Sequence, residues 1–194
     1  MGMRSLLAIL LLAVGAVASA HPPRIATFDQ LMSALGSVKE ARSTFVETRH
    51  IQQLKTPLTV HGDLYYHAPA TLREHIDGEQ ETWYEIHGDV MRMKRGGEGM
   101  REFELRQYPL LWAYIESIRA TLSGDARTLR RFYTIEFTAE RHHWHLVLKP
   151  RERSIAAKVQ SIGISGSATR VARIIVVEST GDTSSMALRP MAAH

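Results

Sequence analysis

The sequence has 194 residues, of which 44% are hydrophobic and none is cysteine. The lack of cysteine excludes disulfides, thiolate metal sites and cysteine nucleophiles. Its 24 Lys and Arg residues against 20 Asp and Glu residues give a formal net charge of +4, and because these charges are dispersed along the chain they argue against a nucleic-acid-binding protein.

The first 20 residues have the pattern of a secretory signal peptide. Arg4 precedes the apolar run LLAILLLAVGAVA, and ASA at 18–20 offers small residues for cleavage. The run is shorter than the roughly 20 apolar residues of a membrane-spanning helix. His21, not a cysteine, would follow the cleavage site, so no lipid anchor is expected. We therefore expect an exported, soluble protein that begins near His21, with residues 21–194 forming a single domain.

The exported part begins with a predicted helix and continues as a series of strands. Thr27 and Gln30 fit a capping box at the helix start. Apolar residues then recur at helical spacing up to about residue 40, namely Phe28, Leu31, Met32, Leu35 and Val38. Strand-like segments separated by Pro, Gly or Asp-Gly follow, and they favour antiparallel hairpins. These strands cover residues 42–54, 58–68, 71–76, 81–88, 90–95 and 101–106.

Residues 108–131 interrupt the strands with a helical insert. Gly124 provides a stop for its first helix, and Asp125 can cap a second, short one. The first helix carries one apolar stripe, formed by Leu111, Ile115, Ile118 and Leu122. Strands resume over residues 132–140, 142–150, 158–166, 169–180 and 183–190.

The predicted elements indicate an α+β chain with about eleven short antiparallel strands in one large curved sheet, capped by helices. The segment ARIIVVE, residues 172–178, is apolar on both strand faces, whereas a strand with one solvated face is polar on that side. Either a helix covers its second face or that face lines an apolar hollow, and the sequence leaves both alternatives open.

The ten histidines raise the alternative of a metal enzyme or a hydrolase. His143 and His145 in HHWH share a strand face, but a metal site needs further ligands and second-shell support. His61, His67 and His75 have no nucleophile arrangement such as GxSxG near them. We therefore expect the histidines on solvated strand faces, no catalytic or metal site, and no cofactor.

Aromatic and methionine side chains are more prominent than any catalytic motif, and methionine adapts well to flexible apolar ligands. Ordinary core packing accounts for most of them individually. Together with a helical lid, they and their apolar neighbours favour a lipid-binding cavity. The candidate cavity and lid residues are Leu64, Tyr66, Trp83, Met91, Met93, Leu111, Trp112, Ile115, Ile118, Trp144 and Ile175.

Seven features in chain order resemble the LolA family of periplasmic outer-membrane lipoprotein carrier proteins. They are the amphipathic first helix, STFVETR, GDLYYHAP, LSGD, HHWHLVLKP, VQSIGISG and TGDTSSMAL. The resemblance implies an incomplete antiparallel β-barrel capped by helices, with an apolar cavity and no enzymatic activity. It also implies a monomer that carries the acyl part of a lipoprotein or another lipid between an inner-membrane donor and an outer-membrane acceptor, with only peripheral membrane contact.

One position departs from the family pattern. Ala68 stands before Pro69, where the resemblance predicts an arginine that ties the lid to the barrel, so Arg73 becomes a candidate for that contact. This departure favours a relative that carries another acylated or polyene-like lipid. The alternative is a periplasmic binding or sensor module of the same fold that recognises a protein partner.

Overall fold

The computed structural model describes residues 25–191, so the expected signal peptide lies outside the described residues. Within them, no helix is long and apolar enough to cross a membrane. The elements, in chain order, are α1 (Phe28–Gly36), β1 (Glu40–His50), β2 (Leu58–His67), β3 (Thr71–Ile76), β4 (Thr82–His87), β5 (Val90–Arg95), β6 (Arg101–Glu104), η1 (Leu105–Gln107), α2 (Pro109–Ser123), α3 (Ala126–Phe132), β7 (Tyr133–Glu140), β8 (His143–Pro150), α4 (Arg153–Ala156), β9 (Val159–Ser167), β10 (Arg170–Glu178) and β11 (Thr183–Pro190).

The strands form one antiparallel sheet in the order β6-β5-β4-β3-β2-β1-β11-β10-β9-β8-β7. Each half of the sheet is a meander, and the two meanders join where β1 pairs with β11, with Phe45 opposite Leu188. In the described residues β6 and β7 are the two ends of the sheet, so the barrel is not closed. The predicted α+β class and the incomplete antiparallel barrel of eleven strands are therefore confirmed.

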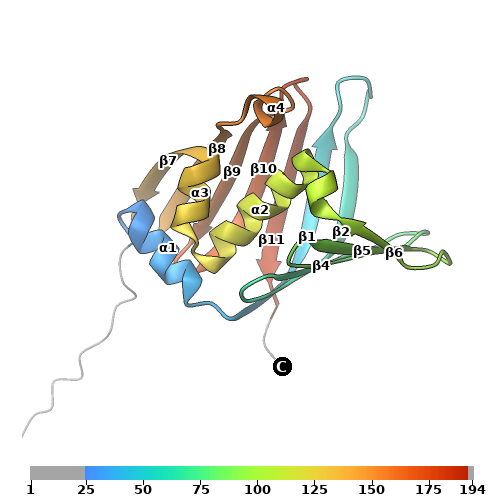
Figure 1. The fold of residues 1–194 in the computed structure, drawn as a ribbon, viewed down its shortest axis with the longest axis horizontal. Helices are drawn as coiled ribbons and strands as arrows, with labels where there is room; N and C mark the ends of the chain where they lie inside the picture. The colour runs from blue at the N-terminus through green and yellow to red at the C-terminus, as the bar shows by residue number, and fades with distance from the viewer. Residues whose placement is uncertain (1–24, 192–194) are drawn as a thin grey trace, which may run out of the picture.

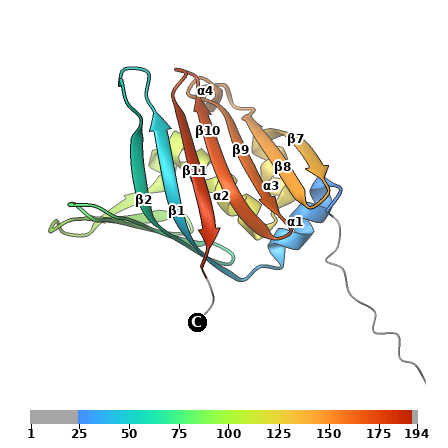
Figure 2. The ribbon, with the colours of Figure 1, turned by 180° about the vertical axis from the view of Figure 1, so that it is seen from behind.

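Helices α1, α2 and α3 cover one face of the sheet, and strands alone form the opposite side (Figures 1 and 2). A core cluster lies between these helices and β7 to β11, where Leu31, Leu129, Leu146 and Ile164 are at most 1% exposed. A second cluster lies between α2 and β2 to β6, and it includes Tyr66. The inner face of the sheet is thus largely apolar, which explains why apolar and polar residues alternate along the strands.

The helices begin and end close to the positions that the sequence predicts. The Thr27 hydroxyl accepts a hydrogen bond from the Gln30 amide, while the Gln30 side chain accepts one from Ala26, one residue earlier than in a capping box. Gly124 ends α2 with φ of 71°, and the Asp125 carboxylate caps α3. The short helix α4 is not predicted, since its four residues are too few to show a period.

The sheet turns sharply beyond β2, so that β4 to β6 run across the direction of β1 and β11 (Figure 1). Gly62 in β2 points inward at this turn, opposite Phe45 and Ile76. A Cβ atom at Gly62 would lie 1.9 Å from the His75 carbonyl oxygen. Since no side chain fits there, only glycine allows β2 and β3 to approach this closely.

Replacing Gly62 with alanine is expected to destabilise the fold by about 2–4 kcal/mol, because the new methyl group must displace the backbone of β3. Urea unfolding measures the change. Gly163→Ala is the matched control, since a Cβ in this β9 glycine meets its nearest atom at an ordinary 3.7 Å. Equal stability of the two variants would contradict this account.

Candidate functional site

A largely apolar cavity of about 490 Å³ lies between α2 and the inner face of the sheet. This volume is within the range of small-molecule and cofactor sites. Its wall is formed by Arg49, Leu64, Leu72, Glu74, Ile76, Tyr84, Ile86, Met91, Met93, Phe103, Tyr108, Leu111, Tyr114, Ile115, Ile118, Ile174 and Met186. The wall combines β1 to β6, β10, β11 and one face of α2, so the joined meanders and the helix all contribute.

Helix α2, which we call the lid helix, covers the cavity with Leu111, Tyr114, Ile115 and Ile118. Their spacing of three and four residues puts them on one helical face. The Tyr133 hydroxyl, buried at the start of β7, donates a hydrogen bond of 2.6 Å to the Ala113 carbonyl oxygen of this helix. Burial raises the pKa of Tyr133 to about 12, so this hydroxyl stays protonated and keeps donating at neutral pH.

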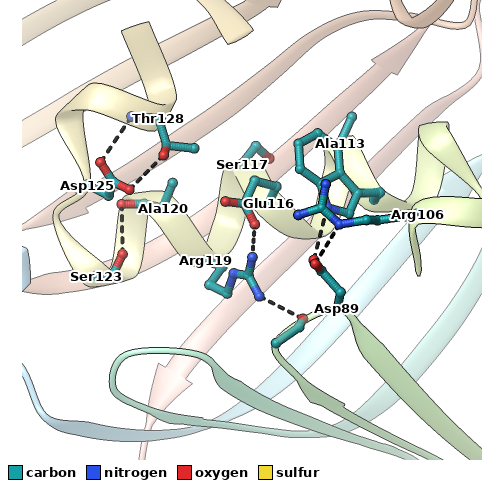
Figure 3. Close-up of polar contacts among 12 residues, drawn as sticks. Asp89, Arg106, Ala113, Glu116, Ser117, Arg119, Ala120, Ser123, Asp125 and Thr128 are labelled. Carbon is teal, nitrogen blue, oxygen red and sulfur yellow. Dashed lines mark hydrogen bonds and ion pairs between the residues drawn. The ribbon is translucent and has the colours of Figure 1, made fainter. Parts of the chain in front are cut away.

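Arg119 ties the lid helix to the turn between β4 and β5. Its guanidinium donates a hydrogen bond of 2.7 Å to the Gly88 carbonyl oxygen and pairs with Glu116 one turn earlier (Figure 3). The Arg119 side chain is only 16% exposed, so this hydrogen bond is shielded from water better than a surface contact. The helix is therefore fixed to the strand meander that forms the opposite wall.

Asp89, in the same turn, gives a second contact. Its carboxylate accepts a hydrogen bond of 3.2 Å from Trp112 Nε1 of the lid helix and one of 2.7 Å from Arg106 Nε (Figure 3). The hydrogen bond from Arg106 holds the pKa of Asp89 below its usual value, so the acceptor is charged at neutral pH. We call Asp89, Arg106, Trp112 and Arg119 the lid tether.

The expected tether Arg73 has a different role. It lies on the outer face of β3, pairs with Glu85 at 3.0 Å and stacks over the Tyr65 ring. Because side chains alternate along a strand, the inward position of Leu72 places Arg73 outside. Ala68, at the position where the resemblance predicts an arginine, packs against the second core cluster.

Charged side chains lie in and beside the cavity despite its apolar character. Arg49 Nε and Nη2 donate hydrogen bonds of 2.9 and 2.8 Å to the Glu47 carboxylate, which also accepts one from the Ser184 hydroxyl. Glu47 is buried, whereas the Arg49 side chain is 47% exposed, so Arg49 lies at the border between the cavity and solvent. This pair balances its own charge.

Glu74 also lines the cavity, and it lies between Leu72 and Ile76 on the inner face of β3. Burial raises its pKa to about 7, repulsion from Glu47 adds to the rise, and Arg49 opposes it. Tyr114 faces it from the lid helix, and the pKa of that hydroxyl is raised by its own burial and then by the negative charge of Glu74. The cavity therefore holds a carboxyl group that changes charge near neutral pH.

The structure brings together a majority of the predicted site residues. Those on the cavity wall are Leu64, Met91, Met93, Leu111, Ile115 and Ile118. Tyr66 is buried in the second core cluster, beside the wall.

The other predicted site residues lie elsewhere. Trp144 is buried in the first core cluster, and Trp112 belongs to the lid tether. Trp83 and Ile175 point away from the cavity, because Tyr84 and Ile174 are the inward residues of their strands. Trp83 stacks on the His75 ring at 3.8 Å on the outer face.

The histidines do not form a metal centre within residues 25–191, where no group of three or more His, Asp or Glu side chains is placed to hold an ion. His61, His67, His143 and His145 are exposed on outer strand faces. His75 is half-buried beneath Trp83.

Sequence reasoning missed the polar part of the wall, Arg49, Glu74 and Tyr114. The position of Glu74 could have been predicted from the sequence. Leu72, Glu74 and Ile76 share one strand face, so the acidic residue lies between two apolar residues that face inward. Tyr114 follows Leu111 by three residues and falls on the same helical face. No such signal exists for Arg49, because it lies near the end of its strand, beyond the apolar residues that mark the inner face.

Comparison with known proteins relates the chain to one family. Residues 20–193 match the family model described as outer membrane lipoprotein carrier protein LolA-like. No curated protein matches the sequence significantly.

The solved structures that the chain matches have little sequence identity with it. A LolA superfamily protein from Nitrosomonas europaea is 8% identical, with 88% of this chain and 96% of that chain covered and a TM-score of 0.45. An outer membrane lipoprotein-sorting protein domain from Vibrio parahaemolyticus is also 8% identical, with 86% and 92% covered and a TM-score of 0.45. MucB in complex with MucA is 10% identical, with 86% and 56% covered and a TM-score of 0.40.

The raised pKa of Glu74 predicts a pH-dependent stability. Its carboxyl has an ordinary pKa of 4.5 and a folded pKa of about 7, so between these values the folded chain keeps a proton that the unfolded chain releases. Stability therefore falls as pH rises from 4.5 to 7, by on the order of 3 kcal/mol in total. Glu74→Gln removes this loss, and we expect it to raise the free energy of unfolding at pH 8 by roughly 2–3 kcal/mol more than at pH 4.5.

Urea unfolding at the two pH values measures this difference. Glu85→Gln, on the outer face of the neighbouring strand, is the control and is expected to show no such dependence. A Glu74→Gln effect of the same size at both pH values would contradict the raised pKa of this half-buried carboxyl group.

Proposed function

The chain belongs to the LolA-like family of outer membrane lipoprotein carrier proteins, and from this premise we propose that it is a periplasmic carrier. It binds the acyl part of a lipoprotein or another lipid in the cavity beneath the lid helix and shuttles it between membranes. The observation that carries this proposal is the apolar cavity of about 490 Å³ between the lid helix and the sheet.

The cavity offers the chemistry that an acyl chain needs. Leucine, isoleucine and methionine side chains from both the strands and the lid helix line it. Each methylene group that leaves water for such a wall contributes about 0.8 kcal/mol, and methionines adapt to chains of different shape. Binding of this kind involves no bond chemistry, so the proposal describes a carrier and not an enzyme.

Uptake and release need an opening in the wall, and we propose that it forms at the lid tether. On one side the lid helix contacts the β4 to β5 turn through Arg119 and Trp112. On the other side it is held by the buried Tyr133 hydroxyl. We infer that the contact between Asp89 and Arg106 separates first, because these side chains are 33% and 68% exposed and contacts beside solvent are weaker than buried ones.

Transport between two membranes requires two partners. A donor at the inner membrane loads the cavity, and an acceptor at the outer membrane takes the lipid, while the protein itself makes only peripheral membrane contact as a monomer. Ala68 stands where the family resemblance predicts an arginine that ties the lid to the barrel. Because this residue of the lipoprotein carriers is replaced, we propose that the cargo can be another acylated lipid.

The first test is direct detection of bound lipid. Native mass spectrometry of the protein purified from the periplasm is expected to show acyl species in complex with it. Ile115→Trp places a larger side chain in the cavity and is expected to reduce uptake of a fluorescent fatty acid at least about tenfold, since the ligand loses the volume that the indole fills.

Met93→Trp, on the opposite wall, should act in the same way, so that the result does not depend on one variant folding well. Val46→Trp is the matched control, because Val46 is 39% exposed on the outer face of β1. A wild-type protein that is empty on purification and takes up no fatty acid would overturn the carrier proposal. Pull-down of a stoichiometric protein partner, unaffected by Ile115→Trp, would then support the binding-module alternative.

The second test concerns the lid tether. Asp89→Ala removes the acceptor for Trp112 and Arg106, and we expect it to speed dissociation of a bound fluorescent fatty acid by roughly 3- to 30-fold, in line with the loss of one or two charged hydrogen bonds. Stopped-flow measurement of release gives the rate. Asp77→Ala, a carboxylate on the outer side after β3, is the control, and equal release rates in both variants would rule out the tether.

A further inference from the structure

Glu74 is a carboxyl group in the cavity that packing does not explain. On the inner face of the sheet its neighbours are Leu72 and Ile76 along β3, Leu64 on β2 and Tyr84 on β4. All four of these residues line the cavity together with Glu74. An acid enclosed by apolar and aromatic wall residues costs stability, so its presence there points to a ligand contact.

The other charges near Glu74 do not neutralise it. Arg49 is the one basic residue among the wall residues described, and two of its nitrogens donate hydrogen bonds to Glu47 at 2.9 and 2.8 Å. The positive charge of Arg49 is therefore matched by Glu47. With Glu74 ionised, the group Glu47, Arg49 and Glu74 has a net charge of −1.

The Glu74 carboxylate also has no internal donor in residues 25–191. The side-chain hydrogen bonds of that part of the chain satisfy Glu47 through Arg49 and Ser184, but none of them reaches Glu74. Tyr114 from the lid helix faces the same space. The carboxylate oxygens thus remain available to a group inside the cavity.

We propose that the cavity selects a long-chain amphiphile whose polar group is an ammonium, bound by the Glu74 carboxylate, over one that ends in a carboxylate. This inference rests on the proposed function, because it assumes that the cavity takes up a long apolar chain. It adds the polar end of the ligand and makes Glu74 the residue that determines specificity.

The chemistry of the three simplest polar ends supports this order. An ammonium donates hydrogen bonds and compensates the charge of Glu74 inside a wall of low polarity, where a paired charge is strongly favoured over an unpaired one. An alcohol donates one hydrogen bond but leaves the charge uncompensated. A carboxylate adds a negative charge to a group whose net charge is already −1, and like charges in such surroundings repel.

The experiment compares three ligands with the same chain length, dodecylamine, dodecanol and dodecanoate. Isothermal titration calorimetry on the delipidated mature protein at pH 8, below the aggregation concentrations of the ligands, gives the three dissociation constants. We expect dodecylamine to bind at least about tenfold more tightly than dodecanoate, with dodecanol between them. In Glu74→Gln the ratio of amine to carboxylate affinity should fall to roughly 1 to 2, while dodecanol affinity changes by less than about twofold.

Glu85→Gln is the matched control, since this glutamate lies on the adjacent strand but faces outward to Arg73, and it should keep the wild-type ratio. Thermal unfolding of each variant shows whether it is folded. If dodecanoate binds as tightly as dodecylamine, or if Glu74→Gln keeps the preference, the ammonium inference is overturned and the carrier proposal stands. If none of the three ligands binds the wild-type protein, the carrier proposal itself fails.

Discussion

The close approach of two strand backbones at Gly62 is the constraint on which the rest of this structure depends. The carbonyl oxygen of His75 occupies the space that any side chain at that position would need, and beyond β2 the sheet turns (Figure 1). That turn brings β4 to β6 across the front of the sheet, so their inner faces and the lid helix enclose a space instead of extending a flat surface. Without it, Met91, Met93 and Phe103 would have no opposite wall.

The two halves of the sheet pack against the helices in different ways. The half of the sheet from β7 to β11 packs tightly on α1 and α3, and Leu146, Leu148 and Ile162 are at most 1% exposed there. The other half keeps a cavity beneath α2. A dense core on one side anchors the lid helix, and a looser region on the other side leaves the cavity open, which is the arrangement that the proposed carrier needs.

Much of this arrangement could be predicted from the sequence, because it depends on local patterns. Strand alternation gave the eleven strands, Asp125 and Gly124 gave the helix ends, and the stripe from Leu111 to Leu122 gave the lid. The pairing of β1 with β11 joins the first and last strands, and no local sequence pattern predicts it. The prediction that Trp83 lines the cavity was wrong for another reason. Its residue type favours a lipid-binding wall, but alternate residues of a strand face opposite sides, and Tyr84 is the one that faces inward. The tether was missed because Asp89 and Arg119 are thirty residues apart.

The open ends of the sheet at β6 and β7 have a mechanical consequence. In a closed barrel, every increase in circumference must break a ladder of main-chain hydrogen bonds. Here helices span the seam between these two strands, and they pack on the sheet largely through apolar side chains and not through a ladder of main-chain hydrogen bonds. The girth of the molecule can therefore change at the seam while all ten strand pairings stay intact, which fits the proposed uptake of cargoes of unequal thickness.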